Sequence, residues 1–197
     1  MRSSNHELII HRGETFTLDF QLTNKDGSPY IVGKDLINPH YLITIASALY
    51  RETNRRIIHY WIPVTEVFEY TQIVNLSDIK NASDSDTPKY DSLPAELPSG
   101  YFNGLEVQFE EGDCVFKHDG EYYYYDDGWK KYESHLVVNF PGTDTSKLIE
   151  QNYFYSIRLV GGNKLDSNNK NTNDIDNSIP ILPSTKLSVL SNLTGGM

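Results

Sequence analysis

The residues of this chain that could do chemistry are one cysteine, six histidines and a set of neighbouring carboxylates. Cys114 is the only cysteine, so the chain can form neither an internal disulfide nor a zinc site built on cysteines. No two histidines stand at a spacing that would bring both to one metal ion, and His59 lies in an apolar, aromatic stretch. We therefore interpret Cys114 and His59 as strand residues rather than as catalytic groups.

Paired carboxylates are the other candidates for catalysis. Asp126 and Asp127 stand beside aromatic residues, and two carboxylates brought together can form a glycosidase site. In the sequence "DDG" they also have the composition of a tight turn between strands. The chain contains no G-x-S-x-G, H-E-x-x-H, phosphate-loop or dinucleotide-binding motif. We expect a protein that is not an enzyme and needs no cofactor.

The stretch "DSNNKNTNDIDN", residues 166–177, is rich in the oxygen ligands that calcium prefers. A calcium-binding EF-hand loop, however, needs a central glycine and a terminal glutamate, and Lys170 falls on a ligand position. We interpret this stretch as part of a long, solvated, Asn-rich loop over 161–183. No metal site is predicted.

The charge and hydropathy of the chain disfavour several classes of partner. A net charge of −10 repels phosphate backbones, so we expect no nucleic-acid binding. No apolar run reaches the length of a membrane span, and the first residues lack the apolar region of a secretion signal. We expect a protein that is made in the cytoplasm and has no membrane partner.

Strict alternation of apolar and polar residues predicts two strands with one buried face. In "ETFTLDFQLT" the apolar residues recur at every second position, and "YFYSIRLV" repeats this pattern near the C-terminus. A period of two places all apolar residues of a strand on the same side. The predicted core residues are Phe16, Leu18, Phe20, Leu22, Ile157 and Leu159.

Many short strands separated by turn residues predict an all-β sandwich or distorted barrel. We assign residues 1–74 and 134–197 to a sandwich domain, with a strand expected over 65–74. Residues 75–103 are polar and carry three of the nine prolines, which predicts an exposed loop. Residues 104–133 read as a small β insertion with an aromatic hairpin.

The hairpin is predicted within "GEYYYYDDGWKKYE", residues 120–133. Because successive side chains of a strand point to opposite faces, Tyr122 and Tyr124 should lie on one side, and Tyr123 and Tyr125 on the other. The aromatic rings can form a small local core, contact another subunit, or stack on a sugar with Trp129. The candidate binding residues are Tyr123, Tyr125, Asp126, Asp127, Trp129 and Tyr132.

Three segments resemble a known family. The stretch "HRGETFTLDFQLTNKDGSPYIV" resembles the opening of the N-terminal domain of phage baseplate upper proteins and related tail-fibre attachment domains. "HLVVNFPGTDTSKLIEQNYFYSIRLV" is similar to the strand, short helical turn and strand of that family, and "ILPSTKLSVLSNLT" to its last strand. Residues 75–133 have no counterpart in it. The positions that match the opening pattern are Gly13, Phe16, Leu18, Phe20, Leu22, Asp26, Gly27 and Pro29.

The resemblance implies an immunoglobulin-like β-sandwich in a virion, acting as an adaptor between the tail or baseplate and a fibre. Its partners would be other virion proteins, in a homo-oligomeric ring or trimer assembled in the host cytoplasm. The resemblance carries over no catalytic residues. The alternative is a carbohydrate-binding module that uses the Tyr/Trp hairpin for attachment to the host surface.

Overall fold

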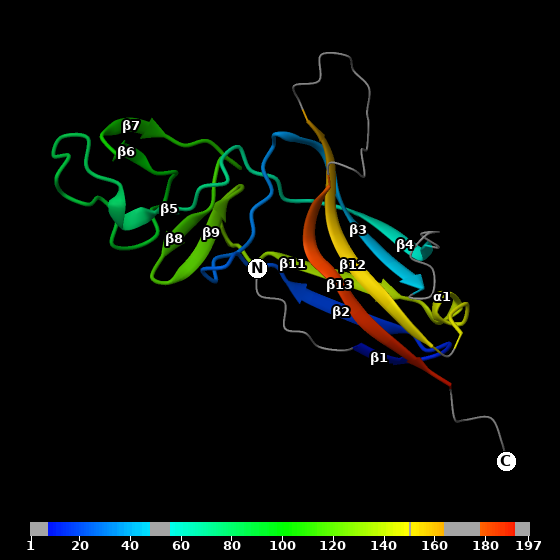
Figure 1. Ribbon diagram of the computed structural model, residues 1–197. Helices are drawn as coiled ribbons and strands as arrows, with labels where there is room; N and C mark the ends of the chain where they lie inside the picture. Colours follow the sequence, from blue (N-terminus) through cyan, green and yellow to red (C-terminus); the bar gives the residue numbers. More distant parts are fainter. Residues whose placement is uncertain (1–7, 48–55, 150, 164–177, 192–197) are drawn as a thin grey trace. The chain divides into compact units, whose positions relative to one another are not determined.

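The structure is a computed structural model that describes residues 8–47, 56–149, 151–163 and 178–191 (Figure 1). The described part consists mostly of β-strands, with one short α-helix and one 3-10 turn, so the predicted all-β class is confirmed. The chain divides into two compact units. Unit 1 comprises residues 1–27, 36–64 and 135–197, and unit 2 comprises residues 28–35 and 65–134.

The larger layer of unit 1 is a five-stranded sheet with the strand order β1-β13-β12-β3-β4. β1 runs parallel to β13, and the other neighbours are antiparallel. The long strands β3, β12 and β13 are rich in Ile, Val, Leu and Tyr, which favour a pleated and partly buried surface. The bounds are β1 Leu8–His11, β3 Leu36–Ser47, β4 Arg56–Pro63, β12 Asn152–Asn163 and β13 Ile179–Leu190.

The second layer of unit 1 is an antiparallel pair, β2 (Phe16–Gln21) and β11 (His135–Phe140), as Figure 1 shows. Aromatic rings join the two layers. The ring of Phe20 lies 6.4 Å from that of Tyr155 on β12, and Phe140 meets Tyr60 on β4 edge to face at 5.3 Å. Unit 1 therefore has a sandwich-like core between two β layers.

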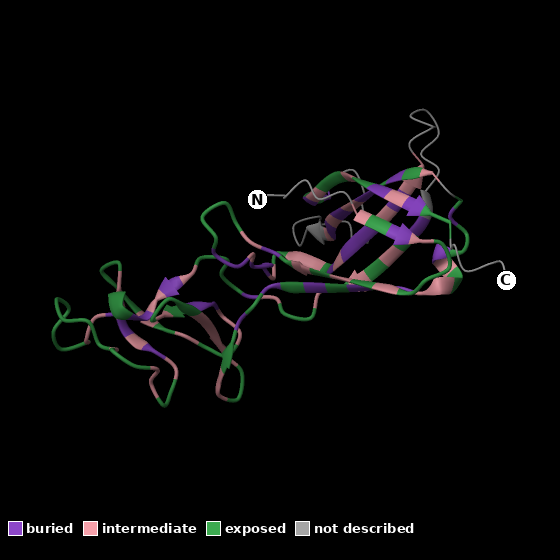
Figure 2. Cartoon of the chain, turned by 90° about the horizontal axis from the view of Figure 1, so that it is seen from below, coloured by how far each residue is buried: buried purple, intermediate pink, exposed green. Residues whose placement is uncertain are grey.

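The predicted core residues lie on the inward side of these strands. Leu22, Ile157 and Leu159 are buried. Along β2 the apolar positions are half-buried and the polar ones exposed, and β11 alternates fully between exposed and buried positions. Figure 2 shows buried positions recurring along the strands, whereas most connecting segments are exposed. The period-two prediction for β2 and β12 is confirmed.

The alternation in β11 gives a matched test, because Val137 is 56% exposed and its neighbour Val138 only 1%. We expect Val138→Ala to lower the free energy of unfolding by roughly 2–3 kcal/mol, through lost apolar burial and the cavity left behind. Val137→Ala should cost less than about 1 kcal/mol. Urea denaturation measures both, and equal losses would show that β11 does not face the core as described.

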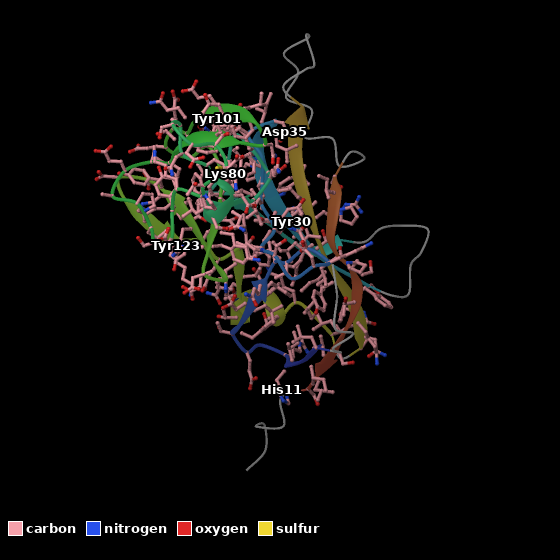
Figure 3. All side chains as sticks on the ribbon, turned by 90° about the vertical axis from the view of Figure 1, so that its left-hand side faces the viewer. His11, Tyr30, Asp35, Lys80, Tyr101 and Tyr123 are labelled. Carbon is pink, nitrogen blue, oxygen red and sulfur yellow. The ribbon has the colours of Figure 1, made fainter. Side chains whose placement is uncertain are left out.

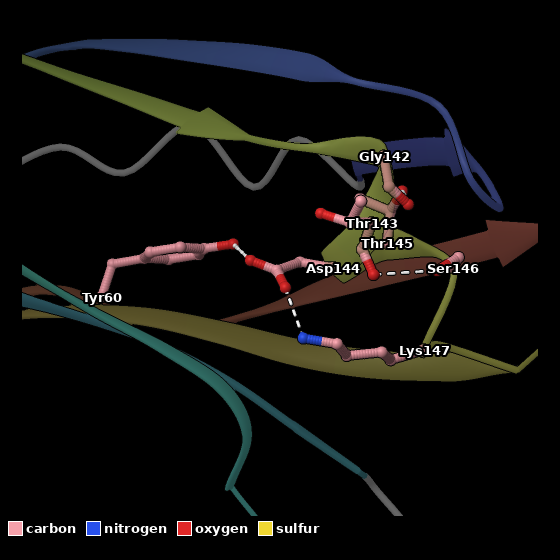
Figure 4. Close-up of polar contacts among 7 residues, drawn as sticks. All are labelled: Tyr60, Gly142, Thr143, Asp144, Thr145, Ser146 and Lys147. Carbon is pink, nitrogen blue, oxygen red and sulfur yellow. Dashed lines mark hydrogen bonds and ion pairs between the residues drawn. The ribbon is translucent and has the colours of Figure 1, made fainter.

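A polar contact fixes β4 to the single turn of helix α1 (Gly142–Thr145), which follows β11 (Figure 4). The Tyr60 hydroxyl donates to Asp144 at 2.5 Å, and the Lys147 ammonium donates to the other Asp144 oxygen at 2.5 Å. These bonds, from Lys147 first and then Tyr60, lower the pKa of Asp144. Burial, followed by the bond to Asp144, raises the pKa of Tyr60.

These shifts predict a pH window for the contact. The lowered pKa of Asp144 stabilises the fold above the unfolded value of about 4, and this stabilisation is lost as the pH falls through the folded value. Because the pKa of Tyr60 is raised in the folded chain, the neutral phenol stabilises the fold below the unfolded pKa of about 10, and this stabilisation is lost as the pH rises through the folded value. Tyr60→Phe should therefore lower the Tm between about pH 5 and 9, and the difference from the parent should shrink below about pH 4.

Thermal unfolding over this pH range measures the effect, with the exposed Tyr70 changed to Phe as the control. A Tm difference for Tyr60→Phe that stays constant down to pH 2 would contradict the role given to the ionised Asp144.

Unit 2 is built on a small four-stranded sheet with the order β10-β9-β8-β5. A separate antiparallel hairpin, β6 (Ser99–Phe102) and β7 (Leu105–Gln108), joins residue Lys80 through a bridge to Tyr101; Figure 3 labels both residues. The 3-10 turn η1 spans Leu76–Asp78. The sheet strands are β5 Val74–Asn75, β8 Phe116–His118, β9 Glu121–Tyr125 and β10 Trp129–Lys131.

Unit 2 has two small apolar clusters instead of one core. Cluster A contains the buried residues Val74, Leu76, Ile79, Cys114 and Phe116. Cluster B contains the buried residues Ile31, Phe68, Val115 and Tyr132. The consecutive residues Cys114, Val115 and Phe116 thus alternate between the two clusters, as expected for an extended segment covered on both sides.

The structure differs from the predicted domain boundaries. Unit 2 begins at Thr65 instead of residue 75, and it includes residues 28–35, which the sequence pattern places in the sandwich. Residues 28–35 belong there because Ile31 is part of cluster B, and because Phe68 exchanges backbone hydrogen bonds with Val32 and Lys34.

The segment 75–103 is not simply an exposed loop. Leu76 and Ile79 are fully buried in cluster A, and the segment contains η1 and β6. The longest exposed stretch of the segment is residues 82–89. The polar composition conceals a few apolar residues that are irregularly spaced and so leave no periodic signal.

The other predicted loop, 161–183, is described only at its two ends, which extend β12 and β13. The calcium-like stretch 166–177 lies outside the described residues.

The strand predicted over 65–74 is wrong except for its last residue, which begins β5. The backbone of this segment is bonded first to Val32 and Lys34, then to Gly112 and Asp113, and last to Val115. Because its partner changes every few residues, no continuous ladder forms.

Candidate binding surface of unit 2

The aromatic hairpin has the predicted form. β9 pairs with β10 so that Tyr125 lies opposite Trp129 and Tyr123 opposite Lys131. Its turn is Asp126–Gly128, in which Asp127 takes a left-handed conformation with φ of 50°. Tyr122 and Tyr124 pack on cluster B. The predicted placement of Tyr122 and Tyr124 on the same face is therefore confirmed, and both side chains take part in the internal packing of unit 2.

Tyr132 is not available to a partner, contrary to the sequence interpretation. It is 4% exposed, and its ring meets Phe68 edge to face at 5.1 Å. Its hydroxyl donates to the Tyr30 carbonyl at 3.0 Å. Burial raises the pKa of Tyr132 to about 12, so the phenol stays neutral and remains a donor. The sequence does not reveal this role because the acceptor is 102 positions away.

Trp129 is half-buried against cluster A and does not form an exposed stacking platform. Its indole nitrogen donates to the Pro94 carbonyl at 2.6 Å. Its ring lies edge to face with Phe116 at 5.3 Å and with Tyr125 at 5.4 Å. Trp129 therefore holds the segment around Pro94 against the sheet.

The other candidate residues lie closer to the surface. Tyr123 is half-buried, and its hydroxyl donates to Glu121 at 2.8 Å. Asp126 and Asp127 are exposed, and Asp126 accepts from Lys130 at 2.5 Å. An ion pair this exposed contributes little stability. The two carboxylates serve the turn, as the "DDG" composition indicates.

An acidic hollow, which the sequence interpretation missed, lies beside the hairpin. It encloses about 500 Å³ between the segment 65–68 and the residues Glu111, Gly112, Tyr124 and Asp126. Burial, and next the charge of Glu66, raises the pKa of Tyr124 in its wall. Three carboxylates, those of Glu66, Glu111 and Asp126, line the hollow, and no lysine or arginine does. The composition of the walls favours a cationic over an anionic group.

Groups that could do covalent or metal chemistry do not gather in the described part of the chain. Cys114 is buried in cluster A, and burial together with the charge of Asp113 raises its pKa to about 12, so the thiol is not ionised at neutral pH. Within the described ranges, no three His, Cys, Asp or Glu side chains stand close enough to hold a metal ion. The same residues contain no helix long and apolar enough to cross a membrane.

The net negative charge of the chain is concentrated in unit 2. Unit 2 has seventeen Asp and Glu residues against six Lys and Arg residues, a net charge of −11. Unit 1 has ten against eleven, a net charge of +1, and the two values add to the −10 of the chain. A field of one sign on one module attracts partners of the opposite sign and speeds their association.

Comparisons with protein-family models, with curated proteins and with solved structures found no match to this chain.

The contact between Trp129 and Pro94 predicts a local effect of Trp129→Phe, which removes the indole donor. A hydrogen bond contributes about 0.5–1.5 kcal/mol net, so the segment that contains Pro94 should open roughly two to ten times more often. Cleavage after the exposed Glu96 by a glutamate-specific protease should accelerate by that factor. Trp61→Phe, in unit 1, is the control, and an unchanged cleavage rate in Trp129→Phe would contradict the anchoring role.

Proposed function

We propose that the protein is a structural protein of a phage virion, an adaptor in the tail or baseplate that attaches a fibre or a neighbouring subunit. In this proposal unit 1 is the immunoglobulin-like sandwich of the family that the sequence resembles, and unit 2 is a contact module carried by it. The protein acts without catalysis, in a homo-oligomeric ring or trimer with other virion proteins.

The observation that carries the proposal is where the three family-like segments lie. They are far apart in the sequence, but their strands in unit 1 are direct neighbours: β2 pairs with β11, and β12 pairs with β13. The end of the first segment, residues 28–32 with the matching Pro29, falls in unit 2 instead. The residues without a counterpart in the family, 75–133, all fall in unit 2. This division is what a family domain with an inserted module would produce.

The composition of unit 2 supports a role in contacts with protein. Its cores are small, its surface is strongly acidic, and its grooves are open and lined by Glu, Asp, Tyr and Phe. The carbohydrate-binding alternative is less well supported, because Trp129 is half-buried and bonded to the Pro94 carbonyl, and its ring lies edge to face with Tyr125 instead of forming a flat platform with it.

The test is the location of the protein. Particles purified from the phage that encodes this chain should contain it by mass spectrometry, and gold-labelled antibodies against unit 2 should bind at the tail. Light scattering of the purified chain measures the predicted oligomer. Recovery of the chain only from the fraction that is free of particles would overturn the proposal.

A further inference from the structure

One edge of the β6–β7 hairpin has no partner strand among the described residues. β7 pairs with β6 alone. In an antiparallel pair, alternate residues direct their N–H and C=O groups toward the partner and away from it. The Phe109 amide donates to Pro98 on the β6 side, which sets this alternation.

By the same alternation, the backbone groups of Glu106 and Gln108 point away from β6. Tyr101, which lies opposite Glu106 on β6, shows the same alternation. Its N–H and C=O groups point away from β7 and are bonded to Lys80 on the far side of the hairpin. The free edge of β7 therefore presents donors and acceptors at the spacing of a strand.

The hairpin is held firmly in this position. Its turn, Asn103-Gly104, has positive φ at both residues (51° and 78°), the conformation that suits a two-residue hairpin. On β6, a Cβ at Gly100 would come within 2.2 Å of the Lys80 carbonyl, so only glycine allows the close approach to that residue. The edge is thus formed before any partner arrives.

The β7 residues Glu106, Val107 and Gln108, and Phe109 directly after them, line a groove. It encloses about 320 Å³, and its apolar walls come from Phe102, Val107 and Phe109, with Val74 of cluster A beneath. Tyr70, which is 55% exposed, forms another wall. The remaining lining residues are Gln72, Glu106, Gln108 and Asp113. An apolar groove with a polar rim beside an open strand edge suits an extended peptide.

The charge of the groove selects its occupant. Glu106 and Asp113 are its only charged lining residues, and both are acidic. The surrounding unit carries a net charge of −11, so a second copy of unit 2 is repelled, while unit 1 at +1 offers little attraction. The complementary occupant is a basic segment of a different protein.

We propose that the free edge of β7 and its groove bind an extended, basic segment of a partner protein as an added strand. The segment exchanges backbone hydrogen bonds with Glu106 and Gln108. It places an apolar side chain between Val107 and Tyr70, and Lys or Arg side chains against Glu106 and Asp113. This inference names the partner of the proposed adaptor and in that respect rests on the proposed function.

The experiment selects a random heptapeptide library on the purified full chain and measures the affinity of the enriched peptides by fluorescence anisotropy. We expect peptides with net positive charge and alternating apolar residues. Gln108→Pro removes one outward N–H without breaking a bond to β6 and should weaken binding tenfold or more. Glu106→Lys should weaken it as much, whereas Glu96→Lys makes the same charge change at an exposed site outside the groove and should have less than a twofold effect.

Circular dichroism and the Tm must be unchanged in Gln108→Pro, and where they are not, Gln108→Ala with backbone-methylated peptides replaces it. The proposal is overturned if no peptide is enriched, if the enriched peptides are acidic, or if Glu96→Lys weakens binding as much as Glu106→Lys. Because binding is measured on the isolated chain, it can succeed while the protein is absent from particles, which would refute the proposed function alone.

Discussion

The structure of unit 2 depends on one constraint: its central segment, residues 114–116, is too apolar to leave either face in water. Cys114 and Phe116 point to one side and Val115 to the other, and all three are buried. A sheet of four short strands cannot bury two faces by itself. The chain therefore supplies covers, from residues 76–102 over cluster A and from Ile31 and Phe68 over cluster B.

These covers determine which residues remain for binding. Most of the aromatic side chains that suggest a sugar-stacking platform in the sequence pack in or against the two clusters instead. Tyr132 and Trp129 are among them. What unit 2 leaves at its surface is an excess of carboxylates, an acidic hollow, and a strand edge with an apolar groove that no strand of the described residues covers. The module is thus suited to a cationic polypeptide, recognised by charge and by backbone hydrogen bonds.

The sequence is sufficient to predict strands and turns whose formation depends on residues close together in the chain. The alternation in β2 and β12 predicts their buried faces, and "YYYYDDGW" predicts the β9–β10 hairpin, because period and turn composition act over a few residues. The all-β class follows from the same signals.

Features that depend on distant partners could not be predicted in this way. The burial of Leu76 and Ile79 within a polar segment, the inclusion of 28–35 in unit 2, and the bond between Tyr132 and Tyr30 all arise from contacts with residues far away in the sequence. The groove along β7 has the same origin, since its walls come from three separate stretches of the chain. No periodic signal marks such residues, and their polar neighbours hide them.

Unit 2 is a compact, acidic unit of the chain, and we expect it to unfold independently of unit 1, which the two tryptophans allow to be measured. Trp61 lies in unit 1 and Trp129 in unit 2, so chains with Trp129→Phe or Trp61→Phe report on one unit each. Urea unfolding is followed by fluorescence after the buried Phe116 of cluster A is changed to Ala in both chains. The account predicts that the midpoint reported by Trp129 falls while that reported by Trp61 is unchanged. Equal shifts of both midpoints would show that the chain unfolds as a single unit, and would contradict it.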